Sequence, residues 1–233
     1  ANQNNNLFFL NKKDGITLTS IPTEETIVKN KFINNISLNQ QYTYFLNTYG
    51  SLYSLDNKKM KINWFLNLNQ SLDLNPSNLF IGNKIVVSND IIVVTSNEFT
   101  YIINNMNGAI IHKKNFTSVV KPLVINNYLF SITSKNLLIA MNLQDGTIIY
   151  ASNINQKIAD FLNTKKKSVE FKNIVMVNDQ IFIFLKNSYI LKFNVKGSLN
   201  EVDKLPSKLK THPIFVDGSI LYLDFKNKIS IVN

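Results

Sequence analysis

The chain has 233 residues, of which 45% are hydrophobic, and carries a formal net charge of +10 with an isoelectric point near 9.6. It contains no cysteine, which excludes disulfides, thiolate metal sites and cysteine nucleophiles, and no apolar run approaches the roughly 20 residues that cross a bilayer. All 25 basic residues are lysine. Because arginine is the side chain suited to bidentate recognition of phosphate and guanine, we expect no specific nucleic-acid partner.

The N-terminal part of the chain contains short runs of apolar and β-branched residues. Residues 7–10 and 16–20 flank Asp14-Gly15, and they resemble the third and fourth strands of a repeat. A fuller copy follows, in which residues 42–45, 52–56 and 62–64 are separated by short polar turns. Tyr, Phe, Ile and Thr suit a pleated, half-buried surface, so we predict strands at these positions.

From residue 89 onward the same order of turns and apolar runs recurs. Asn89-Asp90 precedes a predicted strand at 91–94, and Asn107-Gly108 separates 100–103 from 109–112. Later copies place predicted strands at residues 128–132, 137–142, 147–150, 181–184, 189–194, 220–223 and 229–232. Asn, Asp and Gly tolerate the positive φ of tight turns, whereas Asn and β-branched residues are weak helix formers. Each copy therefore predicts an antiparallel meander.

A repeat of about 40 to 50 residues with four short strands predicts an all-β chain, a β-propeller of four-stranded antiparallel blades. We expect five to six repeat units, as a complete ring or as part of a larger one, in a single domain over 1–233. The units fall at approximately 1–20, 38–66, 85–115, 122–152, 172–204 and 212–233. Neighbouring blades should cover both faces of each strand. Gly108, Gly146 and Gly197 occupy equivalent third turns, where we expect positive φ.

One stretch is similar to a known repeat. Residues 140–150, with Asn142, Asp145-Gly146 and Tyr150, resemble the repeat of pyrroloquinoline-quinone (PQQ) propellers. In that family a tryptophan a few residues after the Asp-Gly turn packs on the next blade. Trp64 keeps this place, whereas His112 and Tyr150 replace the tryptophan in other copies, so we expect irregular docking between blades.

Residues for catalysis are scarce. His112 and His212 are the two histidines, and the sequence has no Gly-rich phosphate loop, no Gly-x-Ser-x-Gly elbow and no His-Glu-x-x-His helix. Glu24-Glu25 is the one place where two carboxylates adjoin, and a solvated turn explains it. We therefore expect no catalytic residues, no cofactor and no metal site. A PQQ-like enzyme or ligand-binding propeller stays open as the alternative.

Among propellers without a cofactor, the repeat resembles most the BamB outer-membrane assembly lipoprotein family. This resemblance implies a non-catalytic scaffold in the periplasm or at the outer membrane. It also implies a protein partner, either a BamA-like barrel assembly protein or an unfolded outer-membrane protein. We expect no transmembrane segment, and association with the membrane would be peripheral.

The segment between residues 152 and 172 is longer than a normal connection between blades. A short helix in its first half would place Ile158, Phe161 and Leu162 on one side, and Lys165, Lys166 and Lys167 follow directly. A solvated loop with a charged tip is the plain interpretation. Because long excursions from a rigid scaffold often carry binding, these six residues form our candidate partner-binding loop.

Overall fold

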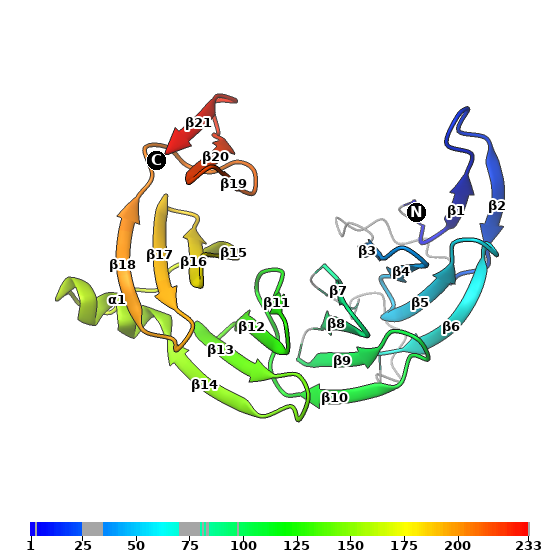
Figure 1. Cartoon of the computed structure of the whole chain (residues 1–233), viewed down its shortest axis with the longest axis horizontal. Helices are drawn as coiled ribbons and strands as arrows, with labels where there is room; N and C mark the ends of the chain where they lie inside the picture. Colours follow the sequence, from blue (N-terminus) through cyan, green and yellow to red (C-terminus); the bar gives the residue numbers. More distant parts are fainter. Residues whose placement is uncertain are drawn as a thin grey trace. The chain divides into compact units, whose positions relative to one another are not determined.

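The computed structural model describes residues 1–2, 4–24, 35–69, 80, 82, 84–96 and 98–232. These divide into two compact units, an N-terminal unit (Ala1–Thr117) and a C-terminal unit (Ser118–Asn233). In both units the strands form antiparallel sheets in chain order, and the described residues contain one helix (Figure 1). The expectation of an all-β chain of mostly four-stranded sheets is confirmed. The assignment of 1–233 to a single domain stays a prediction.

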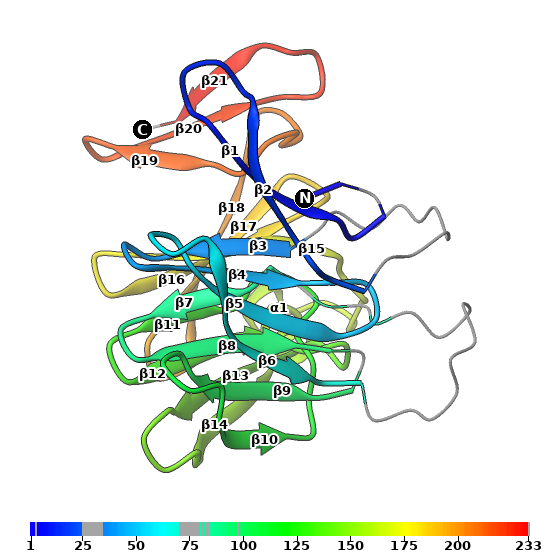
Figure 2. The ribbon, with the colours of Figure 1, turned by 90° about the vertical axis from the view of Figure 1, so that its right-hand side faces the viewer.

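The N-terminal unit contains three sheets. Its strands are β1 (Leu7–Leu10), β2 (Thr17–Ile21), β3 (Asn35–Leu38), β4 (Tyr42–Leu46), β5 (Ser51–Asp56), β6 (Lys61–Asn67), β7 (Val86–Ser88), β8 (Ile91–Thr95), β9 (Thr100–Asn104) and β10 (Ile110–Lys114). β1 pairs with β2, while β3 to β6 and β7 to β10 are four-stranded meanders. Figure 2 shows β3, β4, β5 and β6 side by side in this order.

The C-terminal unit contains two four-stranded sheets and one three-stranded sheet. Its elements are β11 (Leu123–Ile125), β12 (Tyr128–Ile132), β13 (Leu137–Asn142), β14 (Ile148–Asn153), α1 (Ile154–Leu162), β15 (Phe171–Val177), β16 (Gln180–Leu185), β17 (Tyr189–Asn194), β18 (Leu199–Lys204), β19 (Ile214–Val216), β20 (Ser219–Leu223) and β21 (Ile229–Val232). The sheets are β11–β14, β15–β18 and β19–β21, so α1 is an insertion between the first two.

Within each unit the sheets pack face to face. In the N-terminal unit, Tyr44 and Leu52 meet Ile92 and Ile103 in one core between the second and third sheets. In the C-terminal unit, alternate residues of β16 point in opposite directions. Ile181, Ile183 and Leu185 join the core shared with β11–β14, whereas Phe182 and Phe184 join the core shared with β19–β21. Inner strands are therefore apolar on both faces, as the sequence predicts.

The fourth strands depart from that expectation. Along β6 exposed and half-buried residues alternate, and in β14 and β18 no residue is fully buried. These strands lie at one edge of their sheets, where one face of the strand meets water. Both-face burial thus holds for the inner strands and is wrong for the fourth strands.

The turn that leads into the fourth strand has the same construction in several repeats. The side-chain Oδ1 of Asn104, Asn142 and Asn194 accepts the backbone N–H of the residue two positions later, at 2.9 to 3.0 Å. The carbonyl oxygen of each asparagine accepts the N–H of Gly108, Gly146 or Gly197, also at 2.9 to 3.0 Å. Each turn is therefore closed by local hydrogen bonds that the sequence motif itself supplies.

A register shift accompanies this turn. The pairs β1–β2, β5–β6, β9–β10, β13–β14 and β17–β18 all contain one, close to the end that the turn closes. A bulge bends and twists its strand, which lets the outer strand curve around the inner ones. Because β1 and β2 share this shift, they have the geometry of a third and a fourth strand.

Candidate functional site

The three turn glycines are buried and have positive φ, 75° at Gly108, 71° at Gly146 and 82° at Gly197. A Cβ atom added to Gly108 would lie 2.8 Å from Cε3 of Trp64, and one added to Gly197 would lie 2.6 Å from Cε2 of Tyr150. Each aromatic ring thus rests on the glycine of the following repeat. Tyr150 contacts Gly197 in the same way as Trp64 contacts Gly108. At these two places the docking is regular, whereas we expected it from the sequence to be irregular.

The excursion after β14 forms the helix α1. Asn153 caps its N-terminus, because its Oδ1 accepts the backbone N–H of Gln156 at 3.0 Å. Asn163 ends it in the left-handed conformation, with φ of 51°, and donates its N–H to the carbonyl of Ala159. Ile154 is fully buried in the core between β11–β14 and β15–β18, so one end of the helix is anchored in the unit.

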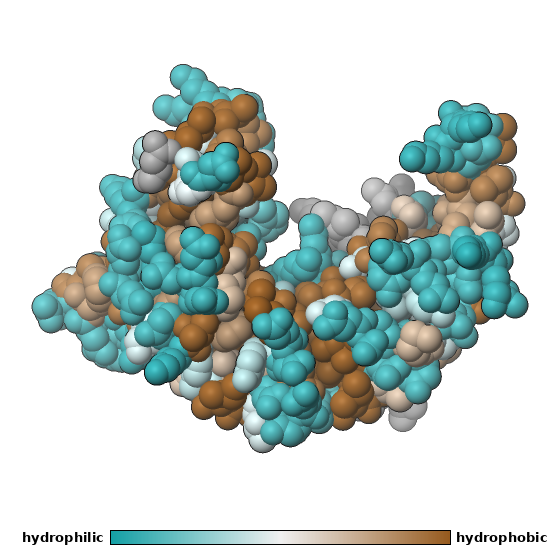
Figure 3. Space-filling view, viewed as in Figure 1, coloured by the Kyte–Doolittle hydropathy of each residue, from teal (hydrophilic) through white to brown (hydrophobic). Residues whose placement is uncertain are grey.

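The far end of α1 carries apolar side chains into solvent. Phe161 and Leu162 are each 45% exposed, whereas Ala159 is buried and Ile158 is half-buried against the core. Figure 3 shows apolar and hydrophilic surface side by side at this end of the helix. Because two large apolar side chains are exposed next to each other on an insertion between blades, this end of the helix is a candidate interaction surface.

A groove of about 360 Å³ lies between this segment and the sheet β15–β18. We call it the α1 groove. Its lining residues are Ile158, Ala159, Leu162, Thr164, Lys165, Lys167, Ser168, Val169, Leu185, Asn187, Tyr189, Leu191 and Val202. Four of the six residues of the predicted partner-binding loop therefore line one depression, whereas Phe161 and Lys166 lie outside its lining. The volume falls in the range of sites that accept a small ligand or a single large side chain.

The groove has an apolar floor and a basic side. Leu185 and Leu191 are fully buried beneath it, and Tyr189 and Val202 are half-buried. Lys165 and Lys167 contribute positive charge from the loop, and the Nζ atom of Lys204 lies 6.0 Å from the centre of the Tyr189 ring. This arrangement suits binding of an apolar group beside a negative charge.

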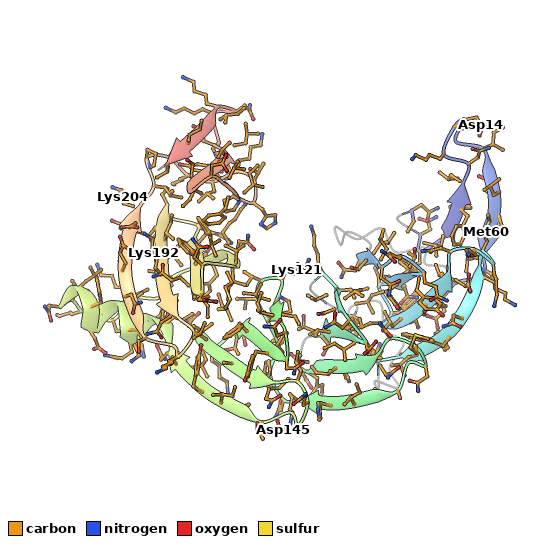
Figure 4. All side chains as sticks on the ribbon, viewed as in Figure 1. Asp14, Met60, Lys121, Asp145, Lys192 and Lys204 are labelled. Atoms are coloured by element: carbon orange, nitrogen blue, oxygen red, sulfur yellow. The ribbon has the colours of Figure 1, made fainter. Side chains whose placement is uncertain are left out.

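A second depression of about 650 Å³ lies between β15–β18 and β19–β21. There Lys192 bonds to Glu201 at 2.9 Å and to Asp203 at 2.8 Å, and Figure 4 places Lys192 beside β17 and Lys204 near the end of β18. Burial alone lowers the pKa of Lys192, but the hydrogen bonds and charges of Asp203 and Glu201 outweigh it and raise that pKa. Lys192 therefore stays charged and serves as an ion-pair centre.

The adjoining carboxylates of the sequence have a structural role where they are described. Glu24 accepts hydrogen bonds from Asn47 Nδ2 at 2.9 Å and from the Ser51 hydroxyl, and its backbone N–H donates to the Tyr53 hydroxyl. Glu25 lies outside the described residues.

In the part of the chain that the structure describes, no group of three or more His, Asp or Glu could hold a metal ion. No helix there is long and apolar enough to span a membrane.

Comparison with known proteins gives the fold. No protein-family model matches the sequence, and no curated protein matches it significantly. Among solved structures, BamB from Moraxella catarrhalis is similar with a TM-score of 0.56 and 10% identity, over 98% of this chain and 79% of that one. The computationally designed Ika8 protein has a TM-score of 0.50 and 10% identity, over 93% and 74% of the two chains.

A third similar structure is BBS1N, solved in complex with ARL6DN, with a TM-score of 0.59 and 11% identity over 82% of this chain and 60% of that one. This chain has a β-propeller fold. Its four-stranded meanders are blades, and α1 is an insertion between two of them. At 10 to 11% identity these similarities establish the fold alone, so function must be argued from the chain's own residues.

Proposed function

We propose that this chain is a non-catalytic propeller scaffold that holds a protein partner at α1 and the loop that follows it. The observation that carries the proposal is the exposure of Phe161 and Leu162 at the end of a helix whose other end is fixed in the core. A surface helix normally turns its large apolar residues toward its own protein. Here two of them face solvent next to a groove, which supports a docking role.

The resemblance to the BamB family supplies the finer part of the proposal. It implies that the partner is a barrel assembly protein like BamA or an unfolded outer-membrane protein. It also implies a periplasmic or outer-membrane-associated location. A blade unit that presents an inserted helix with both ends capped is a suitable scaffold for either partner, because binding would not have to order the backbone of the helix.

The test is affinity capture from native extract, followed by direct binding to the purified partner. Phe161→Asp combined with Leu162→Asp should abolish capture of a stoichiometric partner, since two charges would replace the apolar contact. Phe225→Asp is the matched control, because Phe225 is 65% exposed in the same unit and lies outside the α1 groove. The proposal fails if the double variant captures the same partner as the unmodified chain. It also fails if the control loses the partner equally.

A further inference from the structure

We infer that the partner segment bound at the α1 groove is an acidic peptide with one large apolar anchor residue. The inference rests on the proposed function and adds the chemistry of what is bound. It follows from two properties of the groove, its shape and the charges beside it.

The shape selects an apolar side chain. The floor combines buried Leu185 and Leu191 with half-buried Tyr189, and Leu162 closes one side. With about 360 Å³ the groove accepts a side chain of the size of Leu or Phe together with part of the backbone that carries it. One buried anchor of this size would supply the apolar contact, and the charges beside the groove would have to supply the rest of the affinity.

The charges select acidic flanks. Within the described residues no ion pair involves Lys157, Lys165, Lys166 or Lys167. Of the two carboxylates in the same segment, Glu170 pairs with Lys186 at 2.9 Å, whereas Asp160 accepts a hydrogen bond from the neutral side chain of Gln156 at 2.7 Å and keeps its charge. The four lysines therefore outnumber the one carboxylate without an ion pair, and the field beside the groove is positive.

A membrane surface is the other anionic binding partner that such charges suggest, and the shape argues against it. Interfacial helices bury a continuous apolar face in the lipid, whereas α1 has nine residues and its Ile154 and Ala159 face the protein. The apolar floor is recessed behind Leu162 and the loop. A recess fits a protruding side chain of a peptide better than a flat lipid surface.

The experiment uses the full chain and synthetic peptides of about nine residues. One peptide has a central Leu flanked by Glu, a second has the flanks changed to Gln, and a third has the centre changed to Ala. We expect the first to bind, with affinity that falls as salt is added, and the other two to bind at least about tenfold more weakly. Equal binding of all three peptides would overturn the inference.

Charge reversal makes the test specific for this place. A triple variant should weaken binding of the acidic peptide about tenfold or more and should strengthen binding of a peptide with Lys flanks. It carries Lys165→Glu, Lys166→Glu and Lys167→Glu. The matched control is Lys12→Glu, Lys13→Glu and Lys135→Glu, which makes the same change of net charge at exposed residues that do not line the groove. If the control reverses the preference equally, net charge and not the groove selects the ligand.

Vesicles that contain about a third phosphatidylserine provide the third arm. Binding to vesicles with no binding of the acidic peptide would overturn the inference in favour of a membrane surface. The outcomes also separate the two proposals. If a captured protein partner depends on Phe161 and Leu162 but the acidic peptide does not bind, the scaffold function stands and the proposed peptide chemistry is wrong.

Discussion

The contact between an aromatic ring and a turn glycine occurs in both units, but with different polar groups. In the N-terminal unit Trp64 lies on Gly108, and its indole N–H donates to the carbonyl oxygen of Asn105 at 2.9 Å. In the C-terminal unit Tyr150 lies on Gly197, and its buried hydroxyl has no hydrogen-bond partner among the described residues. The rings occupy equivalent places, yet only the tryptophan has its donor satisfied.

This difference separates two requirements of blade docking. The first is a glycine without a Cβ atom, because the ring lies within 3 Å of where that atom would be. The second is a hydrogen bond to the backbone of the facing turn, which Trp64 makes and Tyr150 does not. An unpaired buried hydroxyl costs about 1 to 3 kcal/mol. Packing of the ring on the glycine is therefore the common element, and the hydrogen bond is additional.

The largest effect is expected for a methyl group beneath the ring. Gly197→Ala should lower the free energy of unfolding by about 2 to 4 kcal/mol, because it adds steric overlap with Tyr150 to the cost of positive φ. Gly218→Ala is the matched control, since Gly218 has the same φ of 82° and no described residue places an atom within 4 Å of an added Cβ. It should cost about 1 kcal/mol. Urea unfolding followed by circular dichroism measures both, and equal costs would show that the ring is not tightly seated.

The next effect concerns the tryptophan. Trp64→Phe should lower the free energy of unfolding by about 1 to 3 kcal/mol, because it removes buried area and leaves the Asn105 carbonyl with one donor fewer. Tyr44 keeps a long hydrogen bond of 3.4 Å to the same oxygen, so the carbonyl is not left without a donor. Circular dichroism is the appropriate probe, since the variant loses the chain's one tryptophan. An unchanged stability would mean that the hydrogen bond contributes nothing.

The smallest effect is expected for the tyrosine. Tyr150→Phe removes a hydroxyl that bonds to none of the residues in the described part of the chain, so stability at neutral pH should change by less than about 0.5 kcal/mol or should rise. Tyr128→Phe, at a side chain that is 44% exposed, controls for the general effect of removing a tyrosine hydroxyl. A loss above about 1 kcal/mol would indicate that the hydroxyl does have a partner in solution.

The same variant should change the response to alkali. Burial raises the pKa of Tyr150 from 10.0 to about 12, so folding favours the protonated hydroxyl. Its contribution to stability is therefore complete below pH 10 and is lost as the pH rises toward 12. The free energy of unfolding, measured at several pH values across this interval, should fall less steeply with pH for Tyr150→Phe than for the unmodified chain. An equal fall in both proteins would show that the hydroxyl is accessible to water.

Turns and strands were predictable because their determinants are local. Asn89 begins a predicted turn and has positive φ, and so do Asn126, Asn178 and Asp217, which precede the corresponding predicted strands of later repeats. The β-prone runs between them became the inner strands of the blades. Local sequence patterns are enough to predict these turns and strands, since each strand pairs with its neighbour in the chain.

The α1 groove was only half predictable. The sequence marks Ile158, Leu162 and the lysines as part of a segment that departs from the repeat. It does not distinguish Tyr189, Leu191 and Val202 from ordinary strand residues. Nothing in the sequence shows that the loop folds back over these strands, because that depends on how Ile154 and Ile158 pack in the core. The contact of Tyr150 with Gly197 was missed for a similar reason, since it joins residues of successive repeats.

Each described strand pairs with a strand that is next to it in the chain, and this has a consequence for folding. Hairpins close over a few residues, so the entropy lost in forming each sheet is small and the sequence separation of most contacts stays short. An all-β chain of this kind can form its sheets one after another as it is synthesised, without waiting for a distant strand. Refolding should therefore begin at several sheets independently, and hydrogen exchange should protect the amides of each meander as a group.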